Sequence, residues 1–288
     1  MSNPVKSGKG QTIEATPQRM VVAAGPASLQ AAVMYDNGDI VLTEDIRWQC
    51  EPSDALAKLK DMIYERPALF DDIPMTLLLK PSMSTLAPHE LIAEGQEEAI
   101  EKILTEFDPS DDKDCFSEEI GDCDSNELLY SLPGGVAGFL ERCFPTEHIS
   151  HELTPFLQCI LPSASRGKGD QMWADIHGNY IHLAAFRNGH LLLANTWHWS
   201  GETDVVYYLI YVWKTLGLDM DNGKLYLSGP NDVRTRVTSE LRKYINYVAI
   251  PSLPREVKSA LSAGLPLSMA YALRKMQSNS PLQEESEE

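Results

Sequence analysis

Hydrophobic and polar positions in the first part of the chain follow the periods of an α/β domain. An apolar run at Met20–Ala24 reads as a buried strand, and two further strand-like segments flank Asn37-Gly38. Apolar residues at helical spacing follow over Ser53–Glu65, and the apolar run Met75–Pro81 predicts another buried strand. The predicted order is therefore strand, strand, strand, helix, strand, which is typical of an α/β fold.

The second part of the chain repeats this order. Gln171–Asp175 predicts a first strand, Asn188-Gly189 lies between two more, and Glu202–Leu216 has helical spacing. Lys224–Pro230 predicts the closing strand, and mixed helical and strand segments follow at Asn231–Lys243 and Tyr244–Ile250.

The two patterns keep a constant spacing over the segments 34–48 and 185–199. Asn37 and Asn188, Gly38 and Gly189, and Trp48 and Trp199 are each 151 positions apart, without a gap. Asn-Gly between strands is a strong hairpin signal, because type I′ turns need positive φ. We predict an internal duplication; the alternative is that three-strand meanders before a helix are common and coincide here.

The repeat predicts the domain organisation. We expect a first subdomain over 19–165, with an insertion at about 83–130, and a second subdomain over 166–275. Residues 1–18 and the acidic segment 276–288 are polar, and we expect both to be disordered tails.

Net charge indicates which partners the protein can bind, and cysteine usage indicates its cellular compartment. The net charge is −18, from 42 acidic and 24 basic residues, which argues against nucleic acid as a partner. The insertion is strongly acidic, so a protein partner docking there should present Lys or Arg. Five irregularly spaced cysteines suit a reducing compartment, and the longest apolar run, Val205–Trp213, is too short to span a bilayer. We expect a cytoplasmic protein with protein partners of unknown identity.

Several segments of the second half resemble a known family. They are Leu193–Trp199, Asp204–Tyr208, Leu216–Leu218 and Leu227–Gly229. They are similar to an uncharacterised bacterial family, domain of unknown function 3822, whose fold is actin-like and built from two ribonuclease-H-like halves. Met269–Arg274 also resembles the last helix of pilus-assembly and cell-division members of the actin-like superfamily. The resemblance covers most of 19–275 and implies duplicated ribonuclease-H-like halves with an actin-like ATPase architecture.

The same resemblance implies motifs for binding a nucleotide, and these motifs are altered in this sequence. Active members have Asp-x-Gly in the first hairpin of each half, for phosphate and metal. Here the first half offers alanine at Ala24, and the second half offers Asp175-Ile-His-Gly178, with the glycine one position late. The turn that contacts adenosine usually has paired glycines, whereas Ser228-Gly229 has one. If ATP and Mg²⁺ bind, the candidate residues are Asp175, Gly178, Ser228 and Gly229.

Each of these candidates also has a structural interpretation. Asp175 can cap the turn that follows its strand, and Ser228-Gly229 can be a plain strand-to-helix turn. Cys143, His148, His151 and Cys159 lack a Cys-x-x-Cys knuckle, so we expect no metal site there and name no catalytic residue.

Three functions follow as hypotheses. The favoured one is a non-catalytic interaction or scaffold protein with degenerate nucleotide motifs. The alternative is a nucleotide-binding protein or weak ATPase or kinase that uses the cleft between the halves. A ribonuclease-H-like nuclease fits least, because Ala24 removes a carboxylate that two-metal chemistry needs.

Overall fold

The computed structural model describes residues 15–81, 83–91, 102, 104, 112–120, 126–146 and 148–278. The two predicted tails lie almost wholly outside these ranges, although the first strand already begins at Pro17. Most of the acidic positions of the insertion also lie outside them, so the expectation of a docking site there stays a prediction.

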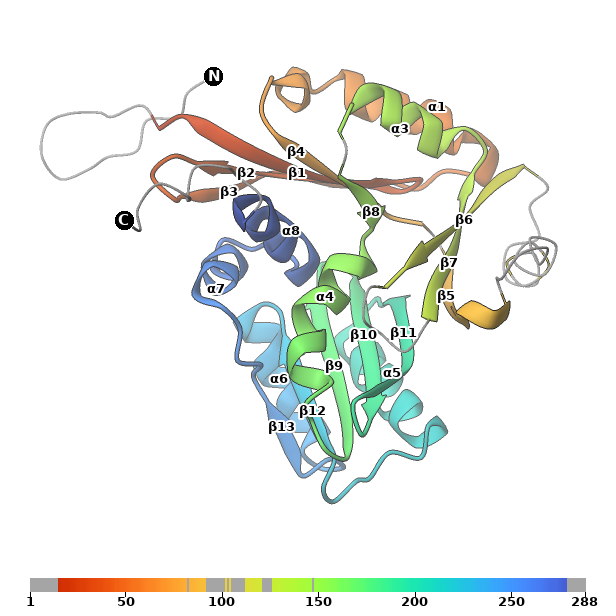
Figure 1. Cartoon of the computed structure of the whole chain (residues 1–288), viewed down its shortest axis with the longest axis vertical. Coiled ribbons are helices and arrows are strands. Elements are labelled where there is room, and N and C mark those ends of the chain that lie inside the picture. The colour runs from red at the N-terminus through yellow and green to blue at the C-terminus, as the bar shows by residue number, and fades with distance from the viewer. Residues whose placement is uncertain are drawn as a thin grey trace, which may run out of the picture.

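The first large sheet has the strand order β3-β2-β1-β4-β8 (Figure 1). Its elements are β1 (Pro17–Gly25), β2 (Ser28–Tyr35), β3 (Ile40–Arg47), α1 (Ala55–Tyr64), β4 (Met75–Leu79), α3 (Val136–Cys143) and β8 (Ile149–His151). The central strands β1 and β2 are buried over six consecutive residues each, whereas β3 at the edge alternates between half-buried and exposed positions. This difference follows from position, since an edge strand keeps one face in water.

The second large sheet has the corresponding order β11-β10-β9-β12-β13. Its elements are β9 (Asp170–His177), β10 (Tyr180–Arg187), β11 (His190–His198), α5 (Glu202–Thr215), β12 (Lys224–Ser228), α6 (Asn231–Leu241) and β13 (Tyr247–Ala249). In both sheets the first two pairings are antiparallel and the last two are parallel. The strands and helices predicted from the sequence occupy equivalent places in the two halves.

The two Asn-Gly turns join equivalent strands, but their geometries differ. Asn188 and Gly189 both have positive φ, at 52° and 88°, and form the predicted two-residue turn between β10 and β11. In the first half only Gly38 has positive φ, and the Tyr35 N–H bonds to the Asp39 carbonyl across a three-residue loop. The type I′ expectation was therefore wrong for the first copy. One extra loop residue lets Asn37 keep an ordinary φ while glycine alone takes the left-handed position.

The two tryptophans of the repeat hold the same place in their sheets. The Trp48 indole N–H donates to the Pro26 carbonyl, and the Trp199 indole N–H donates to the Tyr180 carbonyl, at 2.8 and 3.2 Å. Each ring therefore closes over the turn between the first two strands of its half.

A third sheet is formed by the segment that has no counterpart in the second half. It contains β5 (Met83–Pro88), β6 (Lys113–Glu119) and β7 (Asn126–Pro133), in the antiparallel order β5-β7-β6. It stands beside the first sheet in Figure 1, and β5 also contacts β11 of the second half.

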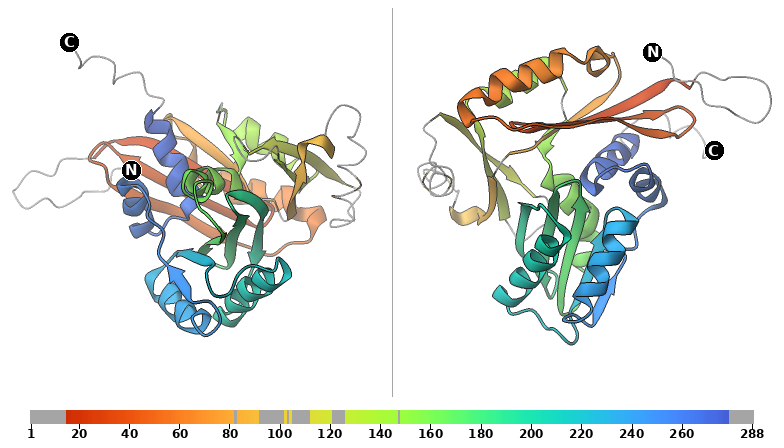
Figure 2. Two further views of the ribbon diagram at one scale, coloured as in Figure 1. Left: turned by 60° about the horizontal axis from the view of Figure 1, so that its bottom comes forward. Right: turned by 180° about the vertical axis from the view of Figure 1, so that it is seen from behind.

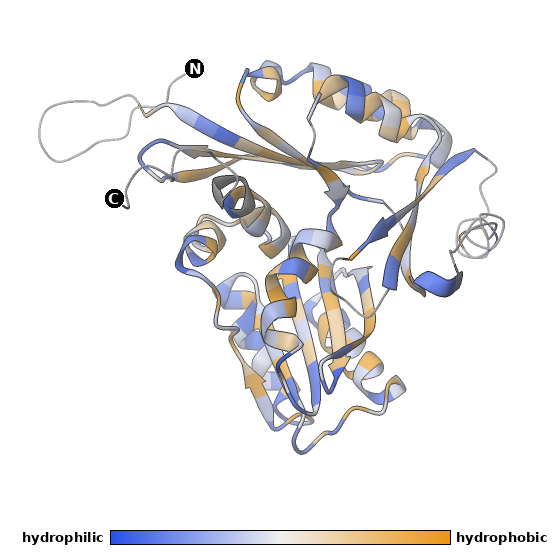
Figure 3. Ribbon diagram, viewed as in Figure 1, coloured by the Kyte–Doolittle hydropathy of each residue, from blue (hydrophilic) through white to orange (hydrophobic). Residues whose placement is uncertain are grey.

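The two large sheets and their helices stack in layers. Helices α1 and α3 cover the outer face of the first sheet, and α5 and α6 cover the outer face of the second (Figure 2). Between the sheets lie α4 (Leu153–Ala164), α7 (Arg255–Ser262) and α8 (Leu267–Ser278). Figure 3 shows the corresponding apolar residues as orange runs along the strands of both sheets. The middle helices give the halves one shared core, so residues distant in sequence meet at this interface.

Candidate functional site between the two halves

The carboxylate of Asp175 lies at the end of β9 and is fully buried. Its Oδ1 accepts a hydrogen bond from the Ser228 hydroxyl at 2.6 Å, because Ser228 is its partner in the parallel β9–β12 pairing. Its Oδ2 accepts the backbone N–H of Leu267, the first residue of α8, at 2.8 Å. Both oxygens are thus used to hold a neighbouring strand and the start of a helix, where a negative charge is favoured.

The two candidate glycines allow close approach of backbone at Gly229 and of a side chain at Gly178. Gly229 has φ of 120°, and a Cβ there would lie 2.2 Å from the Ile176 carbonyl oxygen. Gly178 is in the β9–β10 turn with φ of 49°, and a Cβ there would lie 2.1 Å from Arg47 Nη2 of the first half. The structure brings Asp175, Ser228 and Gly229 together and puts Gly178 at the hairpin tip.

The first half differs at the positions equivalent to Asp175 and Gly229. Ala24 pairs with Leu79 in the register in which Asp175 pairs with Ser228, so alanine replaces the carboxylate. One residue further along the partner strand, Lys80 stands where the second half has Gly229. The chain therefore has a lysine in the first half at the turn where the second half has glycine.

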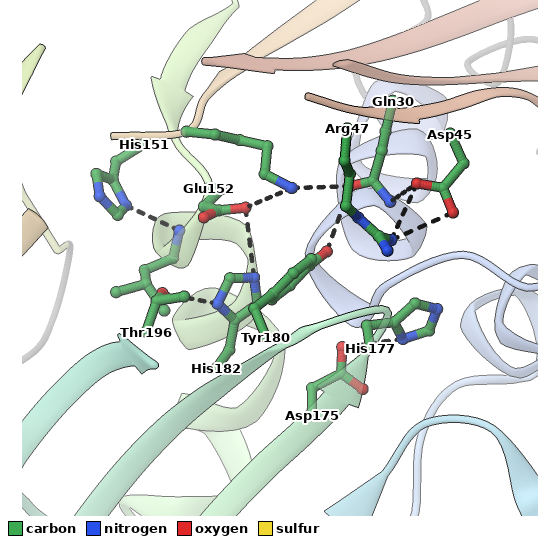
Figure 4. Close-up of polar contacts among 12 residues, drawn as sticks. Gln30, Asp45, Arg47, His151, Glu152, Asp175, His177, Tyr180, His182 and Thr196 are labelled. Carbon is green, nitrogen blue, oxygen red and sulfur yellow. Dashed lines mark hydrogen bonds and ion pairs between the residues drawn. The ribbon is translucent and has the colours of Figure 1, made fainter. Parts of the chain in front are cut away.

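Lys80 is the centre of a buried polar cluster that joins the halves. Its ammonium donates to Gln30 Oε1 at 2.9 Å and lies 3.6 Å from Glu152 Oε2, and both of these side chains are at least 95% buried. The ammonium also lies 4.3 Å from the centre of the Tyr180 ring, on the second half. Figure 4 shows Gln30 of β2, Glu152 at the start of α4, and Tyr180 and His182 of β10 gathered at the interface.

The cluster reflects the corresponding strand order of the two large sheets. Gln30 on β2 pairs across the strands with Asp45, and its amide donates to that carboxylate at 3.2 Å. His182 on β10 occupies the equivalent position and pairs with Thr196, with 2.9 Å between Nδ1 and Oγ1. His182 Nε2 lies 3.6 Å from Glu152 Oε2. Glu152, just before α4, therefore lies between Lys80 of one half and His182 of the other.

Burial dominates the electrostatics of this cluster. Desolvation lowers the pKa of Lys80 and raises the pKa of Glu152, and in each case the attraction of the partner opposes the shift. Burial, followed by the nearby Lys80 charge, holds the pKa of His182 well below its ordinary value. Lys80 and Glu152 thus form a desolvated pair beside a neutral imidazole. Removing either partner would leave the other charge buried without compensation.

His151 connects this region to the start of α4. Its Nδ1 accepts the backbone N–H of Leu153 at 2.9 Å, and its ring packs edge-on against Tyr130 with 4.8 Å between ring centres. Burial lowers the pKa of His151 from 6.5 to about 3. The imidazole is therefore neutral, with the Nδ1 lone pair directed at the helix.

A cavity of about 210 Å³ lies beside the cluster. The turn between β1 and β2 and the turn between β9 and β10 line it from opposite sides, together with Lys80, Arg47 and His198. Arg47 and His198 hold equivalent positions, since each pairs with the first residue of the neighbouring strand. The cavity can admit a small anion, but sites for drug-sized ligands usually measure about 300–1,000 Å³.

Sequence reasoning did not single out Gln30, Lys80, Glu152 or His182. The usable signal was a polar residue within or directly after an otherwise apolar strand. Gln30 lies within the strand Ser28–Tyr35, and Lys80 directly follows the strand Met75–Leu79. Nothing local indicated which of these residues would meet.

The architecture and this interface define the class of protein: the chain has an actin-like ATPase fold. It is similar to a protein of Bacteroides thetaiotaomicron with an actin-like ATPase fold and unknown function. The identity is 20%, 85% of this chain and 95% of that chain are covered, and the TM-score is 0.65. It is also similar to a structure of the PilM–PilN type IV pilus biogenesis complex, at 14% identity, 89% and 98% coverage and a TM-score of 0.50.

The family is shown by a match over residues 8–248 to Protein of unknown function (DUF3822). The chain belongs to this family. A search of curated proteins finds no match. Among the helices described by the structure, none has the length and apolarity needed to cross a bilayer.

Proposed function

We propose that this chain is a cytoplasmic, non-catalytic interaction protein that uses the actin-like shape as a scaffold. The observation that carries the proposal is the carboxylate of Asp175. Its two oxygens accept hydrogen bonds from Ser228 and from the first residue of α8, and the residue is fully buried, so a magnesium ion would have to displace core packing to reach it. At the equivalent position of the first half, Ala24 offers no carboxylate at all.

The cleft supports the same proposal. A nucleotide with magnesium fits poorly in a cavity of about 210 Å³ lined by a buried Lys80–Glu152 pair. Opening it would separate Lys80 and Glu152, which both belong to the first half, from Tyr180 and His182 of the second half.

Interaction through the surface is consistent with the remaining features. The PilM–PilN structure is of a complex, and the fold it shares with this chain can therefore serve assembly. With a net charge of −18, this chain favours partners with Lys- or Arg-rich surfaces, and their association should slow as salt rises.

The test is thermal unfolding with and without millimolar Mg-ATP or Mg-ADP. A ligand that binds only the native state adds about 2.7 kcal/mol of stability at a hundredfold excess over its Kd. We expect no change in the melting temperature. A rise that disappears in R47Q, a half-exposed cavity residue, would refute the proposal and support nucleotide binding in the cleft.

Partner binding can be tested through the insertion. Deleting 108–124 would remove β6, so we choose charge neutralisation, E97Q/E98Q/E101Q, with E51Q/D71N/D72N as the matched control elsewhere on the surface. Partners captured from a lysate of the source organism should associate more slowly with the first variant only. Equal rates for both variants would exclude the insertion as the docking surface.

A further inference from the structure

A second group of ionisable side chains lies at one end of the third sheet, away from the cluster between the halves. His89 follows the end of β5, Glu119 ends β6, and Glu127 is near the start of β7. One ligand atom from each residue lies within 4.8 Å of the others, and His89 Nδ1 is 2.6 Å from Glu127 Oε1. Three strands thus deliver one imidazole and two carboxylates to a single point.

The strand register brings these residues together. Glu119 and Glu127 are direct partners in the antiparallel β6–β7 pairing. On the other side of β7, Ala87 is the partner of Glu127, which places His89 just beyond it. Like charges directly opposite on a ladder are destabilising, so the pairing of the two glutamates is unfavourable unless a cation lies between them.

Burial sharpens this conflict at Glu127. Glu127 as a whole residue is only 6% exposed, whereas the side chain of His89 is 53% exposed. A buried carboxylate requires a compensating charge or several hydrogen bonds. Within the described part of the chain, Glu127 has the imidazole of His89 as its side-chain partner, and Glu119 brings a second negative charge rather than a positive one.

We propose that His89, Glu119 and Glu127 bind a divalent transition-metal ion, with Zn²⁺ as the best match. Nitrogen and carboxylate oxygen are both zinc ligands, at about 2.0–2.2 Å, and three protein ligands plus water complete a tetrahedron. Tetrahedral ligands at that distance lie roughly 3.4 Å apart. The present separations, from 2.6 Å to at most 4.8 Å, require only side-chain rotation to reach it.

Metal binding would tie together the ends of the three strands. It would neutralise the facing glutamates and fix His89, and so would stabilise the third sheet. The proposal is independent of the cleft, and it concerns different residues from Cys143, His148, His151 and Cys159, where the sequence led us to expect no site.

The experiment titrates the full-length protein with Co²⁺ and follows its visible absorption. We expect one ion per chain, with a d–d band but no thiolate charge-transfer band, because the proposed ligands are one imidazole and two carboxylates. A thiolate band would show that Co²⁺ binds the free cysteines elsewhere in the chain instead. The band should be displaced by Zn²⁺ and lost in H89A and E119Q. It should be retained in H148A and E51Q, which change exposed residues outside the cluster.

A second measurement, the melting temperature, tests whether the variants lose the metal site or only their fold. In EDTA, E119Q should melt at or above the wild-type temperature, because the like-charge pair is removed. With Zn²⁺ the order should reverse, since only the wild type gains the ion. The absence of a d–d band in the wild type, its survival in H89A, or an unchanged melting order with Zn²⁺ would each overturn the proposal.

Discussion

Replacing His151 with asparagine should reduce the sensitivity of the protein to mild acid. His151 is neutral because burial lowers its pKa, and its Nδ1 lone pair accepts the N–H of Leu153, so a proton added to Nδ1 would face a donor. Asparagine can accept the same hydrogen bond through its side-chain oxygen but cannot titrate. The variant keeps the contact with α4 and removes the proton linkage.

The magnitude follows from the two pKa values. The folded-state pKa of His151 is about 3, below the ordinary value of 6.5 expected in the unfolded chain. The stability contributed by this residue is therefore complete above pH 6.5. It is lost as pH falls toward 3, because only the unfolded state takes up the proton. Between pH 7.5 and 5.5 the loss from His151 alone is about 1.4 kcal/mol.

Urea unfolding followed by tryptophan fluorescence at pH 7.5, 6.5 and 5.5 measures the effect. At pH 7.5, H151N should be less stable than the wild type by roughly 1–2 kcal/mol, because the ring no longer packs against Tyr130. This deficit should shrink by about 1.4 kcal/mol at pH 5.5. His182 also has a lowered pKa but is present in both proteins, so it cancels in the comparison.

A matched control is H148N, which changes an exposed histidine near the same strand. Its stability should follow the wild type across the pH series. If H151N and the wild type lose stability in parallel between pH 7.5 and 5.5, then His151 is not held neutral in the folded state. The account of the α4 terminus would then be wrong.

Two further pairs of variants test packing within each half by the same urea assay. G229A should cost more than about 2 kcal/mol, because positive φ is combined with a Cβ 2.2 Å from the Ile176 carbonyl oxygen. G169A, also at positive φ but with open space around it, should cost only about 1–2 kcal/mol, and equal losses would contradict the steric argument. K80M should cost about 3–5 kcal/mol by stranding the buried Glu152, and adding E152M should recover most of it. A double variant as unstable as K80M would show that the pair acts through more than its charges.

The sequence by itself determined the repeated order of elements. The strand at Met20–Ala24 follows from an unbroken apolar run, the helix at Ser53–Glu65 follows from a period of 3.6 residues, and their second-half counterparts follow in the same way from local properties of the chain. Asn-Gly also located both hairpins, although the loop of the first one has an extra residue. That difference depends on the pairing of Tyr35 with Asp39, which short-range patterns do not specify.

Only the tertiary structure decided what the polar residues do. Asp175 was recognisable as a candidate, but its partner Leu267 is 92 positions away and meets it because α8 packs between the sheets. Lys80 and Glu152 meet because each directly follows one of the paired strands β4 and β8, and burial against the second half changes an ordinary ion pair into a desolvated one. Short-range pattern defines the elements, whereas the docking of two halves through one shared core decides which charges are buried together.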